Sequence, residues 1–268
     1  MMNDNNLLDA RLIIRISKRS LSFAVDDAGS ERRVTFEPYV VKSGISIAAN
    51  LREAFRESML LGRGYRRALV LTDSPVLLIP LPEFEEAEAE RLYRHSFAGL
   101  SNEQVITTVM PEFSAVAVYT IGHDLQTVVD DHFQDVRYEP LMLPVWRMMH
   151  QRNFTGMHRK LYGYFHDGKL EVFCFDKNRF RFSNSFETRR PNDAVYFLLH
   201  VWKVQAMNTA SDELYLSGEM PDRETLAQLL GQHVKKTYFV NPSAVFNRSH
   251  VTQIKDMPLD LMAHFCMK

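Results

Sequence analysis

Residues 11–25 read RLIIRISKRSLSFAV. Two stretches rich in β-branched and aromatic residues flank a short polar turn, Ser17-Lys18-Arg19-Ser20, and this pattern predicts a β-hairpin. A third extended stretch follows at 33–41, and apolar residues at helical spacing follow it at 45–61. The chain therefore opens with a three-stranded meander and a helix.

Continuous apolar runs come next, at 67–73 and 75–82. Such runs are typical of strands that are buried on both faces. The remaining elements predicted in this first part are a helix at 83–100, a hairpin over 104–121, a helix from His123 and a strand at 137–144. Residues 147–160 are basic and only weakly periodic, and we place a domain boundary there.

The second part repeats the order of the first. The predicted elements are strands at 160–167, 168–176 and 178–187, a helix at 191–207, a strand at 212–218, a helix at 221–232, a strand at 236–242 and a helical tail at 242–266. Leu12 then aligns with Leu161, and Leu69 with Leu214. We predict a duplication: a first half, 1–146, with an inserted hairpin and helix at about 103–134, and a second half, 147–268.

The composition is that of a globular protein with no charge bias. Of 268 residues, 46% are apolar, and 32 lysines and arginines balance 33 aspartates and glutamates, so nothing indicates general affinity for nucleic acid. The first residues, MMNDNNLLDA, lack a signal segment. No apolar run has the roughly 20 residues of a membrane span. Cys174 and Cys266 form no zinc or disulfide pattern, and we expect a cytoplasmic protein without a membrane span.

The order of elements resembles the actin-like ATPase superfamily, whose two halves are each of the ribonuclease-H type. Residues 68–97, ALVLTDSPVLLIPLPEFEEAEAERLYRHSF, are similar to a strand–turn–strand and acidic helix in actin-like proteins of type IV pilus and type II secretion assembly. Residues 139–149, EPLMLPVWRMM, are similar to the strand and helix start that closes the first half of those proteins. The whole chain also resembles a bacterial family of unknown function with an actin-like fold (DUF3822-like). These resemblances imply an α/β fold of two ribonuclease-H-like halves, each a mixed sheet with flanking helices, and a cleft between them.

Nucleotide-binding members of the superfamily carry an aspartate in the first strand and a glycine two residues later. The matching positions here are Arg15 and Ser17. An arginine cannot serve a magnesium ion, which takes oxygen ligands. Ser17, Lys18 and Arg19 could still hold an anion, although a solvated polar turn is the simpler interpretation.

The second-half loops depart from the pattern of the superfamily as well. The hairpin turn contains Asp167, Gly168 and Lys169, an ordinary turn signal, and Gly163 stands near the expected acid. Where the superfamily has paired glycines beside adenosine, this chain has Gly218 followed by Glu219. The resemblance therefore predicts a degenerate nucleotide site.

Two further stretches have alternative interpretations. Residues 123–132 gather histidines and aspartates that could bind a metal, but a charged helix surface explains them, and we expect no metal site. Residues 147–190 are basic, and Phe180 and Phe182 alternate with arginines. RNA binding there would need both rings exposed, and we do not expect nucleic acid as a ligand.

We therefore expect a non-catalytic, degenerate actin-like protein that serves as a scaffold for an unknown protein partner, without a cofactor. The alternative is a nucleotide-binding protein, an ATPase or a switch, that holds ATP in the interlobe cleft. Lys18, Arg19 and Lys169 would then neutralise the phosphates without the usual aspartate.

Overall fold

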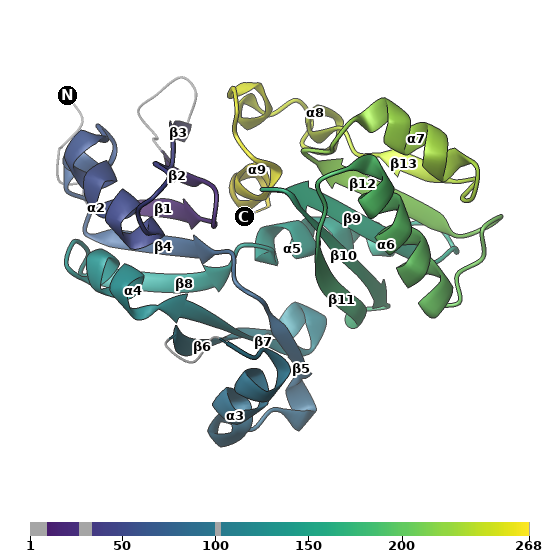
Figure 1. Ribbon diagram of the computed structural model, residues 1–268, viewed down its shortest axis with the longest axis horizontal. Coiled ribbons are helices and arrows are strands. Elements are labelled where there is room, and N and C mark those ends of the chain that lie inside the picture. The colour runs from purple at the N-terminus through teal and green to yellow at the C-terminus, as the bar shows by residue number, and fades with distance from the viewer. Residues whose placement is uncertain (1–9, 27–33, 100–102, 268) are drawn as a thin grey trace. The chain divides into compact units, whose positions relative to one another are not determined.

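The computed structural model describes residues 10–26, 34–99 and 103–267. The chain divides into two compact units. In Figure 1 the first runs from purple to teal and includes the yellow helix at the C-terminal end, and the second runs from teal through green to yellow. The first unit comprises residues up to Leu143 together with Ser249–Cys266, and the second comprises Pro144–Arg248. The last part of the chain thus packs with the first unit, whereas the sequence assigns it to the second half.

A five-stranded mixed sheet forms the centre of the first unit. Its strands are β1 (Arg11–Ile16), β2 (Leu21–Asp26), β3 (Val34–Tyr39), β4 (Arg67–Thr72) and β8 (Asp135–Pro140). Their order is β3-β2-β1-β4-β8, with β1, β2 and β3 antiparallel and β1, β4 and β8 parallel. The meander predicted from residues 11–41 is therefore present.

Helices cover both faces of this sheet. On one face lie α2 (Ile47–Glu57) and α4 (His123–Asp130), which pack on Leu12, Ile14 and Val70. The Ser46 side chain caps α2 by accepting the N–H of Ala49. On the other face lies α9 (Leu259–Cys266), whose Asp260 contacts Arg15.

A separate three-stranded sheet interrupts the first unit between β4 and α4. It consists of β5 (Leu77–Pro80), β7 (Ala115–Gly122) and β6 (Glu103–Met110), in that order, and α3 (Glu86–Ser96) packs on it. The inserted segment thus has different bounds in the structure from those predicted from the sequence. The interruption begins at β5 and ends at β7, and α4 lies beside α2 on the main sheet.

The second unit repeats the architecture of the first. Its strands are β9 (Lys160–His166), β10 (Lys169–Asp176), β11 (Arg179–Glu187), β12 (Glu213–Gly218) and β13 (Thr237–Phe239), in the order β11-β10-β9-β12-β13. One face packs on α6 (Pro191–Val204) and α7 (Arg223–Gly231). The two sheets therefore have the same strand order and the same helix-covered face.

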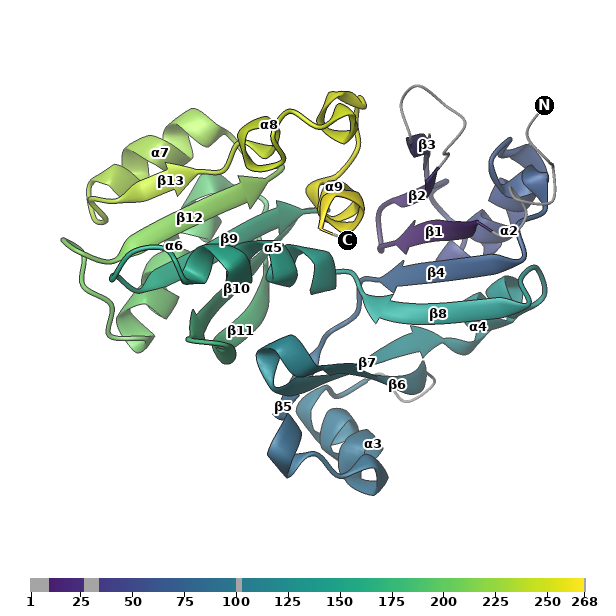
Figure 2. The ribbon, with the colours of Figure 1, turned by 180° about the vertical axis from the view of Figure 1, so that it is seen from behind.

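An aromatic layer covers the other face of the second sheet. Trp146 and His150 of α5 (Leu143–Asn153) meet Phe180 and Phe175 with ring centroids 5.1 and 5.0 Å apart. Figure 2 shows α5 beside β10 of the second sheet. Helix α5 begins within residues 139–149, where the resemblance implied a helix start, and it extends into the stretch 147–160 that the sequence marked as a boundary. The predicted tail helix is instead broken into α8 (Pro242–Val245), a short 3-10 turn at His250–Gln253, and α9.

The registers correct the predicted alignment of the two halves by one residue. Leu12 pairs with Ala68 in β4, and Leu161 pairs with Leu214 in β12. Ala68 and Leu214 both lie in the helix-covered cores. Ala68, rather than Leu69, is therefore the counterpart of Leu214, because a slip of one residue moves a side chain to the opposite face.

Two smaller observations complete the fold. Cys174 is buried in the core of the second unit, where desolvation raises the pKa of its thiol to about 11, so it packs as a small apolar side chain. Within the described ranges, every helix is too short or too polar to cross a bilayer.

Candidate functional site

In the turn between β1 and β2, the side chain of Ser17 accepts hydrogen bonds from the backbone of the turn itself. The Ser17 hydroxyl oxygen accepts the backbone N–H of Arg19 at 3.2 Å and that of Ser20 at 2.9 Å. The N–H of Ser17 donates to the Ser20 carbonyl at 2.9 Å. The backbone N–H groups of Ser17, Arg19 and Ser20 are thus bonded inside the turn, while the side chains of Lys18 and Arg19 are exposed.

Arg15, at the position matched to the aspartate of the superfamily, belongs to a buried ion pair. Its Nε lies 2.9 Å from both carboxylate oxygens of Asp260 in α9. Its Nη1 donates to the Ser20 hydroxyl at 2.7 Å. The side chains of Arg15 and Asp260 are only 2% and 0% exposed, so the pair ties β1, the turn and α9 together within the first unit.

The turn between β9 and β10 in the second unit is a tight hairpin. Asp167 and Gly168 both have positive φ, 49° and 77°, as a type I′ turn requires. The Gly168 carbonyl accepts the N–H of Thr188 at 3.0 Å. His166 is buried beside this turn, and its Nδ1 lies 3.2 Å from a carboxylate oxygen of Asp167. Lys169 follows the turn as the first residue of β10 and pairs with His166.

Gly218 and Glu219 lie next to that hairpin in space. Strands β9 and β12 are parallel neighbours, and Gly218 pairs with Phe165, two residues before Asp167. The N–H of Glu219 donates to the Phe165 carbonyl at 2.9 Å. The structure therefore brings the two predicted loops of the second unit together at the end of the sheet where β9 and β12 both finish. Ser17, Lys18 and Arg19 lie in the first unit.

Phe180 and Phe182 are not the exposed stacking platform that RNA binding would need. Cys174 pairs with Phe182 and Phe175 with Phe180, so Arg181 is an extra residue that forms a β-bulge. The bulge places the two rings on opposite faces. Phe182 packs on the core beneath α6, and Phe180 meets Trp146 at 5.1 Å. Both rings are half-buried.

Sequence reasoning missed Asp260 as the partner of Arg15. A signal was present, because Asp260 is a single acid in the apolar run PLDLMAHF and Arg15 a single base in LIIRI. Charges within apolar runs are buried only when they are paired. What the sequence lacks is any indication that residues 245 positions apart meet.

Solved structures with the same fold agree with this arrangement. A Bacteroides thetaiotaomicron protein, described as having an actin-like ATPase fold and unknown function, is 25% identical with a TM-score of 0.82, covering 95% of this chain and 100% of that one. The PilM–PilN type IV pilus biogenesis complex is 14% identical with a TM-score of 0.56, covering 88% and 89%. No curated protein matches the chain in sequence.

The predicted fold class is thus confirmed: the chain has the actin-like ATPase fold, with two mixed sheets and flanking helices. A family model described as "Protein of unknown function (DUF3822)" matches residues 2–237. Since this match spans most of the 268 residues, the chain belongs to the DUF3822 family.

Proposed function

We propose that this protein is a non-catalytic member of its fold that acts by binding another protein and does not use nucleotide. The observation that carries the proposal is the closed turn at Ser17. Phosphate-binding turns offer backbone N–H groups to phosphate oxygens, but here the N–H groups of Arg19 and Ser20 are bonded to the Ser17 hydroxyl. A phosphate would have to displace that hydroxyl from both.

The charge at the base of the turn also supports the proposal. A magnesium nucleotide needs oxygen ligands for its metal, and Arg15 brings a guanidinium that is already paired with Asp260. The alternative, an ATPase or switch, would rely on the side chains of Lys18, Arg19 and Lys169 alone. Lysine and arginine bind phosphate, but without the metal-holding acid they supply no path to hydrolysis.

If the protein does not use nucleotide, adding nucleotide should leave its thermal stability unchanged. We expect the thermal midpoint to stay unchanged with ATP, ADP or GTP at millimolar concentration, with and without magnesium, because a ligand of the folded state raises the midpoint only above its Kd. A magnesium-dependent rise that Lys18→Ala or Lys169→Ala abolishes would contradict the proposal and support the alternative. Lys203→Ala, an exposed lysine of α6, is the matched control.

The support for a protein partner is an exposed apolar loop after α5. Phe154 is 62% exposed and Met157 is 99% exposed. The loop is held in place, since the Thr155 hydroxyl donates to the Arg152 carbonyl at 2.7 Å and the Asn153 amide to the Lys177 carbonyl at 3.0 Å. Large apolar side chains presented on a fixed loop are typical of contact surfaces.

If the loop that carries Phe154 and Met157 binds a protein partner, retention of that partner by this protein should depend on the loop. We expect the double variant Phe154→Ser, Met157→Ser to keep the wild-type thermal midpoint, because neither side chain is buried. We expect it to retain far less of any protein that the wild-type chain captures from lysate. The control is Met59→Ser, which removes another exposed methionine, 82% exposed beyond α2. Equal capture by the double variant and wild type would contradict a role for this loop.

A further inference from the structure

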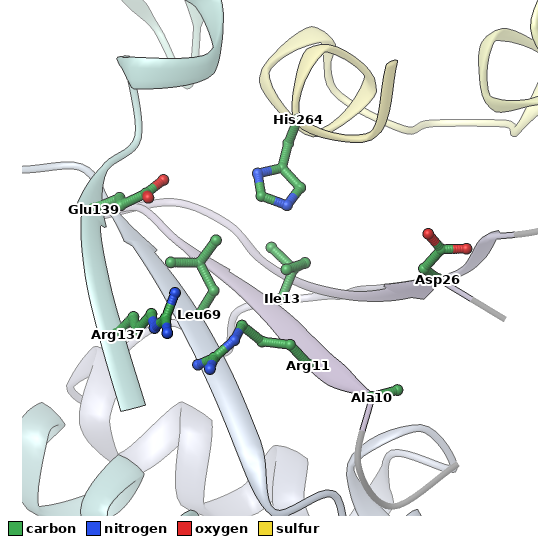
Figure 3. A pocket seen from close by; sticks show the side chains of 8 residues that line it. All are labelled: Ala10, Arg11, Ile13, Asp26, Leu69, Arg137, Glu139 and His264. Carbon is green, nitrogen blue, oxygen red and sulfur yellow. The ribbon is translucent and has the colours of Figure 1, made fainter. Parts of the chain in front are cut away.

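A cavity of about 320 Å³ opens on the face of the first sheet that α9 partly covers. Its wall includes Arg11 and Ile13 of β1, Leu69 of β4, Arg137 and Glu139 of β8, and His264 of α9. Figure 3 shows Glu139, His264, Ile13 and Leu69 around one space, with Arg137 and Arg11 along its lower side. The volume is at the lower end of the range of pockets that bind small organic molecules. The cavity lies by the start of β1, whereas the Ser17 turn follows its end.

The floor of the cavity is apolar. Ile13 pairs with Leu69, and Leu69 pairs with Arg137, so the three residues form one row across β1, β4 and β8. Ile13 is 3% exposed and Leu69 is 4% exposed. Since both side chains lie on the face opposite to α2 and α4, they present a small apolar patch to the cavity rather than to the helix-covered core.

Two arginines line the cavity beside this floor, Arg11 of β1 and Arg137 of β8. Arg11 is fixed, because its Nη1 donates to the Ala68 carbonyl at 2.8 Å and its Nη2 to Asp135 at 2.5 Å. Arg11 and Arg67 both donate hydrogen bonds to the Asp135 carboxylate and lower the pKa of its carboxyl. The negative charge of Asp135 is therefore shared between two guanidinium groups. Arg137 comes from the next row, and Figure 3 shows its guanidinium beside Leu69, apart from that of Arg11.

Groups of mixed charge complete the lining. Glu139 and His264 face each other across the top of the cavity, and Asp26 lies at its far end. The cavity thus offers two guanidinium groups, an apolar floor, and a carboxylate with an imidazole. Guanidinium groups bind carboxylate and phosphate groups through charge-assisted hydrogen bonds.

We propose that this cavity binds a small organic acid. Its carboxylate or phosphate group is held by Arg11 and Arg137, its apolar body lies on Ile13 and Leu69, and a hydroxyl or amino group is met by Glu139 and His264. The site is separate from the turn at Ser17 and independent of whether the protein binds nucleotide.

Calorimetric titration of the full chain tests the site with four probes: benzoate, phenyl phosphate, benzyl alcohol and inorganic phosphate. We expect benzoate or phenyl phosphate to bind, and which of them is tighter distinguishes a carboxylate from a phosphate ligand. Benzyl alcohol lacks the anion and inorganic phosphate lacks the apolar body, so both are expected to bind at least about tenfold more weakly.

The variant Arg137→Gln is expected to raise the Kd of the binding probe by at least about tenfold, since it removes a charge-assisted hydrogen bond. Arg137 is exposed, so the variant folds. Arg52→Gln, an exposed arginine on α2, makes the same change of charge on the other face and should leave the Kd unchanged. Failure of both organic acids to bind, equal binding of inorganic phosphate, or equal losses in the two variants would overturn the proposal.

Discussion

Asp260→Ala is expected to lower the free energy of unfolding by about 3–5 kcal/mol, the usual cost of removing one partner from a buried ion pair. The guanidinium of Arg15 would stay 2% exposed with its Nε deprived of both carboxylate oxygens. An unpaired buried charge has lost its hydration without compensation. Because 1 kcal/mol moves the Tm of a domain of this size by about 2–4 °C, thermal denaturation should show a fall of roughly 6–20 °C.

Two further variants separate charge from packing. Asp131→Ala removes an exposed aspartate at the end of α4 and should change stability by no more than about 0.5 kcal/mol. The double variant Arg15→Met, Asp260→Leu replaces the pair by apolar side chains, an exchange that is often close to neutral, and should regain most of the loss. If Asp260→Ala were as stable as Asp131→Ala, removing Asp260 would not leave a buried charge uncompensated, and this would contradict the buried ion pair described above.

The order of strands and helices along the chain could be predicted from the sequence because the strands carry continuous apolar runs and the meanders carry clear turns. Helix α5 could not. Its first two turns are buried on nearly every side, from Leu143 to Met149, so they lack the polar face that makes an amphipathic helix readable. The broken tail was missed for the opposite reason, since apolar residues at 242–266 fit a helix without showing where it stops.

The candidate loops were placed correctly along the chain, but their bonding was not predictable. The sequence shows a serine in the first turn, and only the structure shows that its hydroxyl accepts two backbone N–H groups. The cavity was even less predictable from the sequence. Arg11, Leu69, Arg137 and His264 come from three strands and a helix, and their neighbourhood follows from the register and from the return of α9 to the first unit.

Gly218→Ala is expected to destabilise the protein by about 2–4 kcal/mol, because two costs combine. Gly218 has φ of +85°, a region that L-residues with a Cβ rarely adopt. A Cβ at this position would lie 2.1 Å from the Phe165 carbonyl oxygen and 2.8 Å from the Tyr164 ring. The carbonyl cannot withdraw without breaking its hydrogen bond from the N–H of Glu219. Urea unfolding measures the loss.

Gly231→Ala is the matched control in the same unit. It is the last residue of α7, its φ is not positive, and a Cβ there meets nothing within 4 Å, so alanine should stabilise the chain by up to about 1 kcal/mol. Equal stability of the two variants would show that the close approach of β9 to Gly218 is not a constraint. The expected contrast bears on function as well. Nucleotide-binding members of the superfamily have glycines here beside adenosine, but in this chain the close approach of the Phe165 carbonyl is sufficient reason for a glycine. A glycine kept at the end of β12 is therefore no sign that the protein still binds nucleotide.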